Sequence, residues 1–92
     1  MPFEYDILPG LKEKILKLQK KDRQLADMLY KKIRQIVNLE ENSIEHFKNL
    51  KYGLSDKKRV HIDKSFVLTF KFDKNLKKVY FIDFGHHGRI YG

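Results

Sequence analysis

Hydrophobic and polar residues alternate over residues 3–7, where apolar side chains are separated by acidic ones. This period of two predicts a short, half-buried strand. Pro9 and Gly10 predict a turn that ends it, because proline cannot donate a ladder hydrogen bond and glycine accepts turn geometry. Apolar residues then recur at helical spacing over residues 11–20, and again up to about residue 39. Asp22 separates the two segments and is suited to cap the second, so an antiparallel helical hairpin is expected.

The second half of the chain changes to the period of strands. Residues 59–62 alternate between apolar and polar, and residues 66–72 place a row of apolar side chains on one face. Residues 73–75 predict a hairpin loop. Residues 76–84 predict a further strand, which is apolar on both faces and is therefore expected to be central in the sheet.

Two shorter segments complete the prediction. Residues 43–50 predict one more helical turn, and Gly85 is expected to interrupt the last strand before a final segment over residues 86–91. The predicted order is β-α-α-β-β-β in the α+β class, with a helical hairpin packed on one face of a mostly antiparallel, twisted sheet. Residues 1–92 are expected to form a single domain, because chains below about 200 residues rarely split.

The composition excludes several classes of function. The 92 residues include no cysteine, which excludes a disulfide scaffold, a thiolate nucleophile and a cysteine-based zinc site. No apolar run approaches the roughly 20 residues of a membrane span, and the first residues lack the pattern of a secretory signal. We therefore expect a cytoplasmic protein that does not associate with membranes.

The net charge of +8 is concentrated in the second half of the chain, which contains ten basic and four acidic residues. Such an excess is typical of nucleic-acid binding, and a lysine-rich surface of a heat-adapted or AT-rich host is the alternative. Lysines 12, 14, 20, 21, 31 and 32 are expected to lie on solvated helix faces. Lys57, Lys58 and Arg59 are candidate phosphate contacts, because they lead directly into a predicted strand.

Histidine, arginine and tyrosine occur together at the end of the chain. If residues 85–91 are extended, His87, Arg89 and Tyr91 share one face, and the apolar Ile90 lies on the other. On the strand over residues 59–62, the apolar residues should point inward, so Arg59, His61 and the following Asp63 should point outward. The two polar sets converge if they lie on the same side of the sheet.

Such a set of side chains suits cleavage of RNA without a metal. The 2′-hydroxyl needs a base and the departing 5′-oxygen needs an acid, and histidine can be either near neutral pH. Arginine can bind the phosphate oxygens in the transition state, and tyrosine can stack on a base. The alternatives are structural histidines or a metal site at His86 and His87, although neighbours on a strand point in opposite directions. No HExxH, P-loop, GxGxxG or GxSxG pattern is present, and neither a metal nor another cofactor is expected.

Residues 59–63, 66–70 and 84–91 together resemble the RelE/ParE toxins, and in particular the RelE/YafQ-like branch that includes archaeal RelE proteins. Residues 49–53 are similar to the Leu-x-Gly segment that precedes the strands in this family. The resemblance implies a toxin that cleaves mRNA in the ribosomal decoding site without a metal. It also implies a small RelB-like antitoxin as partner, with operator DNA contacted only through the toxin–antitoxin complex.

The resemblance also implies roles for individual residues. His87 matches the C-terminal histidine of YafQ-like members, Tyr91 matches the aromatic residue four positions later, and His61 matches the histidine of the preceding strand. Arg59 matches the basic position that opens this strand in many members.

The chain departs from the family pattern at three positions. Lys48 falls near another YafQ histidine, Ser65 near an acidic YafQ residue, and Val67 at the position of an arginine in RelE. These departures favour a histidine-based, YafQ-like site in which Arg89 supplies positive charge, with Lys48 and Lys51 as further candidate phosphate contacts.

Two other functions stay open at the level of sequence. A ParE-like protein would inhibit DNA gyrase and cleave no RNA, but such proteins generally lack the histidines found here. A non-catalytic module that binds RNA or the ribosome would use the same basic surface, and its histidines would have no catalytic role.

Overall fold

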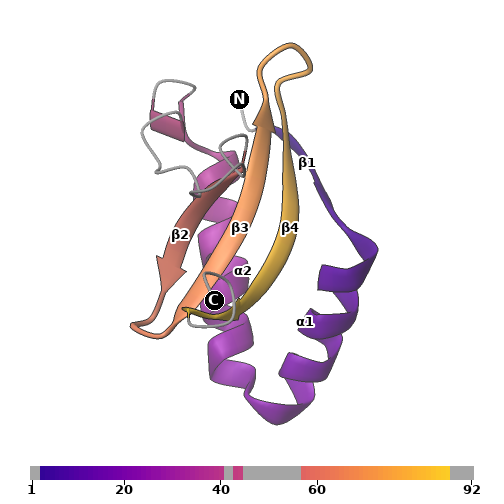
Figure 1. Cartoon of the computed structure of the whole chain (residues 1–92), viewed down its shortest axis with the longest axis vertical. Coiled ribbons are helices and arrows are strands. Elements are labelled where there is room, and N and C mark those ends of the chain that lie inside the picture. The colour runs from indigo at the N-terminus through magenta and orange to yellow at the C-terminus, as the bar shows by residue number, and fades with distance from the viewer. Residues whose placement is uncertain (1–2, 41–42, 45–56, 88–92) are drawn as a thin grey trace.

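The computed structural model describes residues 3–40, 43–44 and 57–87 (Figure 1). The elements follow one another as β1 (Glu4–Ile7), α1 (Pro9–Lys21), α2 (Arg23–Val37), β2 (Lys58–Ile62), β3 (Phe66–Asp73) and β4 (Lys78–His86). The predicted β-α-α-β-β-β order and the α+β class are confirmed. None of the helices in the described ranges is long and apolar enough to cross a membrane.

The four strands form one mixed sheet in the order β1-β4-β3-β2. β1 pairs with β4 in parallel, and the pairs β3–β4 and β2–β3 are antiparallel. β4 is therefore a central strand, as its apolar residues on both faces predict. A register shift between Thr69 and Phe70 leaves Ile82 of β4 without a direct partner in β3. Such a bulge bends the strand and increases its twist.

The helical hairpin begins two residues earlier than expected. Pro9 and Gly10 form the first turn of α1 and not a turn that ends the strand, because a proline at the start of a helix loses no hydrogen bond and has its φ already set. Asp22 caps α2 as predicted, since its Oδ1 accepts a hydrogen bond from the Leu25 N–H at 3.1 Å. α2 ends at Val37, two residues before the expected boundary.

The hydrophobic core lies between the helical hairpin and one face of the sheet. In Figure 1, α2 crosses behind β3, and α1 lies beside the lower half of β4. Leu29 and Ile33 of α2 pack in one cluster with Phe70 and Phe81 of the sheet, and all four side chains are buried. This cluster determines which face of each strand points to the helices and which points away from them.

Two predictions about the later strands are wrong. β4 begins at Lys78 and not at residue 76, because residues 74–77 form a longer turn in which Lys77 has a φ of 53°. Gly85 does not interrupt β4, because it pairs with Val67 and the ladder continues to His86. Of the helical turn expected at residues 43–50, residues 43 and 44 are helical, and the rest lies outside the described residues.

Candidate active site

The face of the sheet turned away from the helices carries one of the predicted histidines. Ile62 and Leu68 pack into the core with the helices. Since successive side chains of a strand point to opposite faces, His61 projects from the other face of β2, and its side chain is exposed. The outward orientation expected for His61 is therefore observed.

His61 and His87 meet on this face. Their rings are nearly parallel, with centroids 5.5 Å apart and 20° between the planes. His61 belongs to β2 and His87 follows β4, and β3 lies between these strands. Strands two places apart in a sheet are separated by roughly 10 Å, so both rings must lean over β3 to come into contact. Of the two polar sets whose convergence the sequence made conditional on the sheet order, His61 and His87 are thus brought together.

A main-chain hydrogen bond holds the backbone of His87 in place. The His87 N–H donates to the carbonyl oxygen of Ser65 at 2.8 Å. Ser65 lies in the turn between β2 and β3, which contains Asp63 at a φ of 56°. The turn that follows β2, the strand of His61, is therefore also hydrogen-bonded to His87. Its conformation determines how the two histidines are placed relative to each other.

His86 lies on the opposite face from His87. Its ring packs edge-on against Phe66 at 5.7 Å, and Phe66 stacks on Phe84 at 5.3 Å. The two neighbouring histidines therefore point in opposite directions, as their places on a strand predict. Within residues 3–40, 43–44 and 57–87, no group of three or more histidine, aspartate or glutamate side chains is arranged to hold a metal ion.

The other predicted residues of β2 divide between the two faces. Arg59 is two residues from His61 and shares its face, whereas Lys58 belongs to the face of Ile62 by the same alternation. Lys57 directly precedes the strand. Asp63 was expected beside His61, but it lines a small hollow with residues 22, 24, 25 and 28 of the helical hairpin and Phe66, so the turn carries it to the helix side.

Four candidate residues lie outside the described residues: Arg89, Tyr91, Lys48 and Lys51. The described part of the site is therefore a pair of exposed imidazoles with a guanidinium on the same strand. Imidazole can accept a proton at one nitrogen and donate one from the other. Two such rings side by side supply a base and an acid without any further group.

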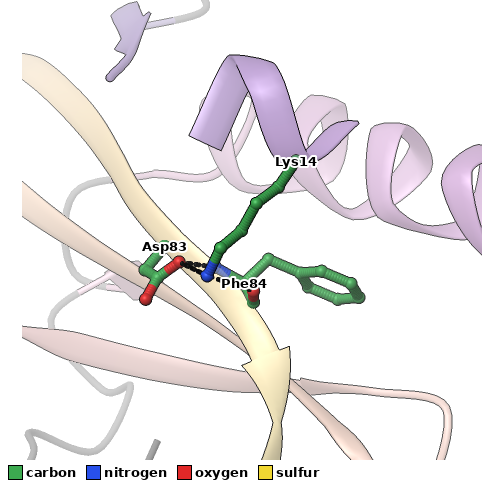
Figure 2. Close-up of polar contacts among 3 residues, drawn as sticks. All are labelled: Lys14, Asp83 and Phe84. Carbon is green, nitrogen blue, oxygen red and sulfur yellow. Dashed lines mark hydrogen bonds and ion pairs between the residues drawn. The ribbon is translucent and has the colours of Figure 1, made fainter. Parts of the chain in front are cut away.

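Sequence reasoning missed a polar arrangement on the other side of β4 (Figure 2). Lys14 of α1 donates to Asp83 Oδ1 at 2.6 Å and to the Phe84 carbonyl at 3.3 Å. Lys17 and Lys21 line the same cleft. Their spacing of i, i+3 and i+7 places the three lysines on one helix face, which is a signal that was present in the sequence.

Comparisons with known proteins establish the family. A protein of Methanocaldococcus jannaschii named as toxin RelE4 is 45% identical to the chain over 89 residues, which are 97% of the chain and 90% of that protein. The chain belongs to the RelE toxins. No protein-family model matches it.

Solved structures of low sequence identity share the fold of this RelE toxin. YafQ from Escherichia coli superposes with a TM-score of 0.74 at 15% identity, covering 98% of the chain and 99% of YafQ. A chain of the RelBE2 toxin–antitoxin complex from Mycobacterium tuberculosis gives a TM-score of 0.74 at 11% identity, covering 95% and 93%. The helical hairpin on a four-stranded sheet is therefore the architecture of its structural relatives.

Proposed function

We propose that this toxin is a ribosome-dependent endoribonuclease that cleaves mRNA without a metal and so inhibits translation. The observation that carries the proposal is the stacked, exposed pair of His61 and His87 on the face of the sheet turned away from the helices. Histidine is the side chain best suited to both accept and donate protons near neutral pH. The excess of positive charge in the second half of the chain suits an RNA substrate.

The reaction follows from the two rings. One imidazole removes the proton from the 2′-hydroxyl, whose oxygen attacks the adjacent phosphorus atom. The other imidazole protonates the departing 5′-oxygen. The products are a 2′,3′-cyclic phosphate and a 5′-hydroxyl. The protein has then taken one proton from the RNA and returned one to it. Arg59, on the same face as His61, supplies a permanent positive charge to the phosphate oxygens.

The residues beyond the described range complete the proposed site. We assign Tyr91 to stacking on an RNA base and Arg89 to the negative charge of the transition state, on the basis of their places in the sequence. Lys57, Lys48 and Lys51 are proposed to bind RNA phosphates. Lys58, which belongs to the helix face by alternation, is proposed to bind phosphate from the edge strand β2.

The proposed partners are an antitoxin, the ribosome and mRNA. The structural relative RelBE2 was solved as a toxin–antitoxin complex, which supports a RelB-like antitoxin for this chain as well. Action on translating ribosomes places the toxin in the cytoplasm.

The function is tested by expressing the toxin from a tightly controlled promoter. Primer extension is carried out on translated and untranslatable versions of one transcript. Cuts within codons of the translated message alone are the expected result. Growth arrest with intact mRNA would contradict the proposal and would indicate a gyrase inhibitor or a binding-only toxin.

The neighbouring histidines offer a matched pair of variants. His87→Ala removes an imidazole of the stacked pair, and we expect cleavage to fall by about 10²–10⁴-fold, the usual contribution of a general acid or base. His86→Ala removes the same side chain one residue earlier, from the opposite face, and is expected to leave cleavage unchanged. Equal activity of the two soluble variants would refute the assignment of His87.

A further inference from the structure

Lys14 of α1 ties the last part of β4 to the helical hairpin. Its Nζ donates to Asp83 Oδ1 at 2.6 Å and to the Phe84 carbonyl oxygen at 3.3 Å, and Figure 2 shows the side chain reaching from the helix to the strand. The same Asp83 oxygen also accepts from the Phe84 N–H at 2.8 Å. One ammonium group and one carboxylate thereby contact both main-chain polar groups of Phe84, three residues before His87.

This contact lies beyond the part of β4 that pairs with β1. The β1–β4 pairing covers residues 78–81, and the register shift against β3 follows directly after it. A bulge lets a strand bend, so the pairing of residues 78–81 does not by itself determine the direction of residues 83–86. These residues pair with β3, and Lys14 adds a fixed point from α1, a helix anchored in the core by the buried side chains of Leu11 and Ile15.

A short path leads from this fixed point to the two histidine rings. Gly85 follows Phe84 and has no Cβ, so its backbone is less restricted than that of other residues. The His87 N–H donates to the Ser65 carbonyl at 2.8 Å, and the His87 ring stacks on that of His61 with centroids 5.5 Å apart. The place of the His87 ring therefore depends on two anchors, the turn at Ser65 and the main chain of Phe84.

We propose that Lys14 is a positioning residue, which holds the end of β4 so that the ring of His87 stacks on that of His61. The inference rests on the proposed nuclease function and adds a residue that acts through His87 and not on the RNA. The side chains of Lys14 and Asp83 are 52% and 42% exposed, and exposed ion pairs contribute little to stability. Loss of the contact is therefore expected to displace the ring of His87 without unfolding the protein. A displacement of about 1 Å at a catalytic group can lower a rate by about 10²-fold.

The kinetic test compares Lys14→Met with Lys17→Met in the full chain. Both variants remove one positive charge from α1, but Lys17 makes no hydrogen bond to β4 within the part of the chain that the structure describes. We expect Lys14→Met to lower the kcat of ribosome-dependent mRNA cleavage about tenfold, with KM and melting temperature unchanged. Lys17→Met is expected to keep the wild-type kcat, and Lys14→Arg, which retains a charged donor, is expected to restore most of it. An equal rise of KM in both methionine variants with unchanged kcat would show that Lys14 acts through its charge alone, and would overturn the proposal.

NMR tests the placement of the rings directly. The nuclear Overhauser effect between the ring protons of His61 and His87 reports their contact in the free toxin, without RNA. We expect this effect to be lost in Lys14→Met and retained in Lys14→Arg and Lys17→Met. An unchanged effect with unchanged kcat in folded Lys14→Met would overturn the positioning role alone. A wild type that shows the ring contact but cleaves no mRNA would overturn the proposed function, and loss of the contact in Lys14→Met would still establish the positioning role.

Discussion

Histidine rings can transfer protons only where their nitrogens remain accessible and their positions are fixed. His61 satisfies both conditions, because it is exposed and its ring stacks on that of His87. Replacement by phenylalanine keeps a flat ring that can stack but removes both nitrogens. We expect His61→Phe to lower mRNA cleavage by about 10²-fold or more with an unchanged melting temperature. Full cleavage by a folded His61→Phe protein would exclude proton transfer by this side chain.

Lys78 at the other end of β4 provides a test of surface electrostatics. Its Nζ lies 2.9 Å from Asp6 Oδ2. This hydrogen bond raises the pKa of Lys78 above its ordinary value of 10.5, and the charge of Asp6 acts in the same direction, although desolvation opposes it. The stabilisation is therefore fully present below pH 10.5 and is lost as the pH rises through the raised pKa.

An NMR titration of the Lys78 side chain checks this shift. We expect its pKa to lie above the ordinary lysine value of 10.5, and Asp6→Asn is expected to lower it toward that value. An unchanged titration of Lys78 in the Asp6→Asn variant would mean that the ion pair does not persist in solution.

At the scale of elements, Asp22 holds the helical hairpin together by capping α2. Asp22→Ala removes the acceptor of the Leu25 N–H and is expected to lower the free energy of unfolding by about 1 kcal/mol. Asp22→Asn keeps a capping oxygen and is expected to lose much less. Urea denaturation of both variants measures the difference, and equal stability of the two would show that the cap contributes nothing.

The turn between β2 and β3 determines where the two candidate catalytic rings lie. Asp63 has a φ of 56° in this turn, a conformation that glycine adopts freely and β-branched residues resist. Asp63→Gly is expected to preserve stability, whereas Asp63→Val is expected to cost about 1–2 kcal/mol. Because the His87 N–H bonds to Ser65 of the same turn, Asp63→Val should also lower cleavage. Denaturation and cleavage assays on both variants test this link, which unchanged cleavage in a folded Asp63→Val protein would refute.

At the scale of the whole molecule, stability depends on a small core. A 92-residue chain buries a smaller fraction of its surface than a larger domain does, so its margin is thin. Phe81 is completely buried between the helices and the sheet. Phe81→Ala is expected to cost about 3–5 kcal/mol, enough to unfold much of the protein at growth temperature.

Leu76 is the matched control for this substitution, because its side chain is 61% exposed in the turn before β4. Leu76→Ala is expected to change the free energy of unfolding by less than about 0.5 kcal/mol. Thermal unfolding followed by circular dichroism compares the two variants, and similar melting temperatures would contradict the assignment of the core.

The spacing of apolar residues was sufficient to predict the elements, their order and the faces they bury, because burial of one face imposes the period of a helix or strand. The same alternation placed His61 outward and His86 opposite His87. Predictions from single glycine and proline residues were wrong at two positions, where the surrounding helix or strand accommodates the residue. Gly85 continues its strand because Val67 pairs with it, and Pro9 starts a helix because the first turn needs no N–H.

Contacts between distant elements depended on the tertiary structure alone. The rings of His61 and His87 meet only because β2 and β4 flank β3 in the observed register. Lys14 and Lys21 were expected on a solvated helix face, and the packing of α1 beside β4 places them in a cleft with Asp83. Periodicity indicates which side of an element is buried, but it carries no information about which elements become neighbours. Those neighbours are determined by the packing of all the elements into one common core.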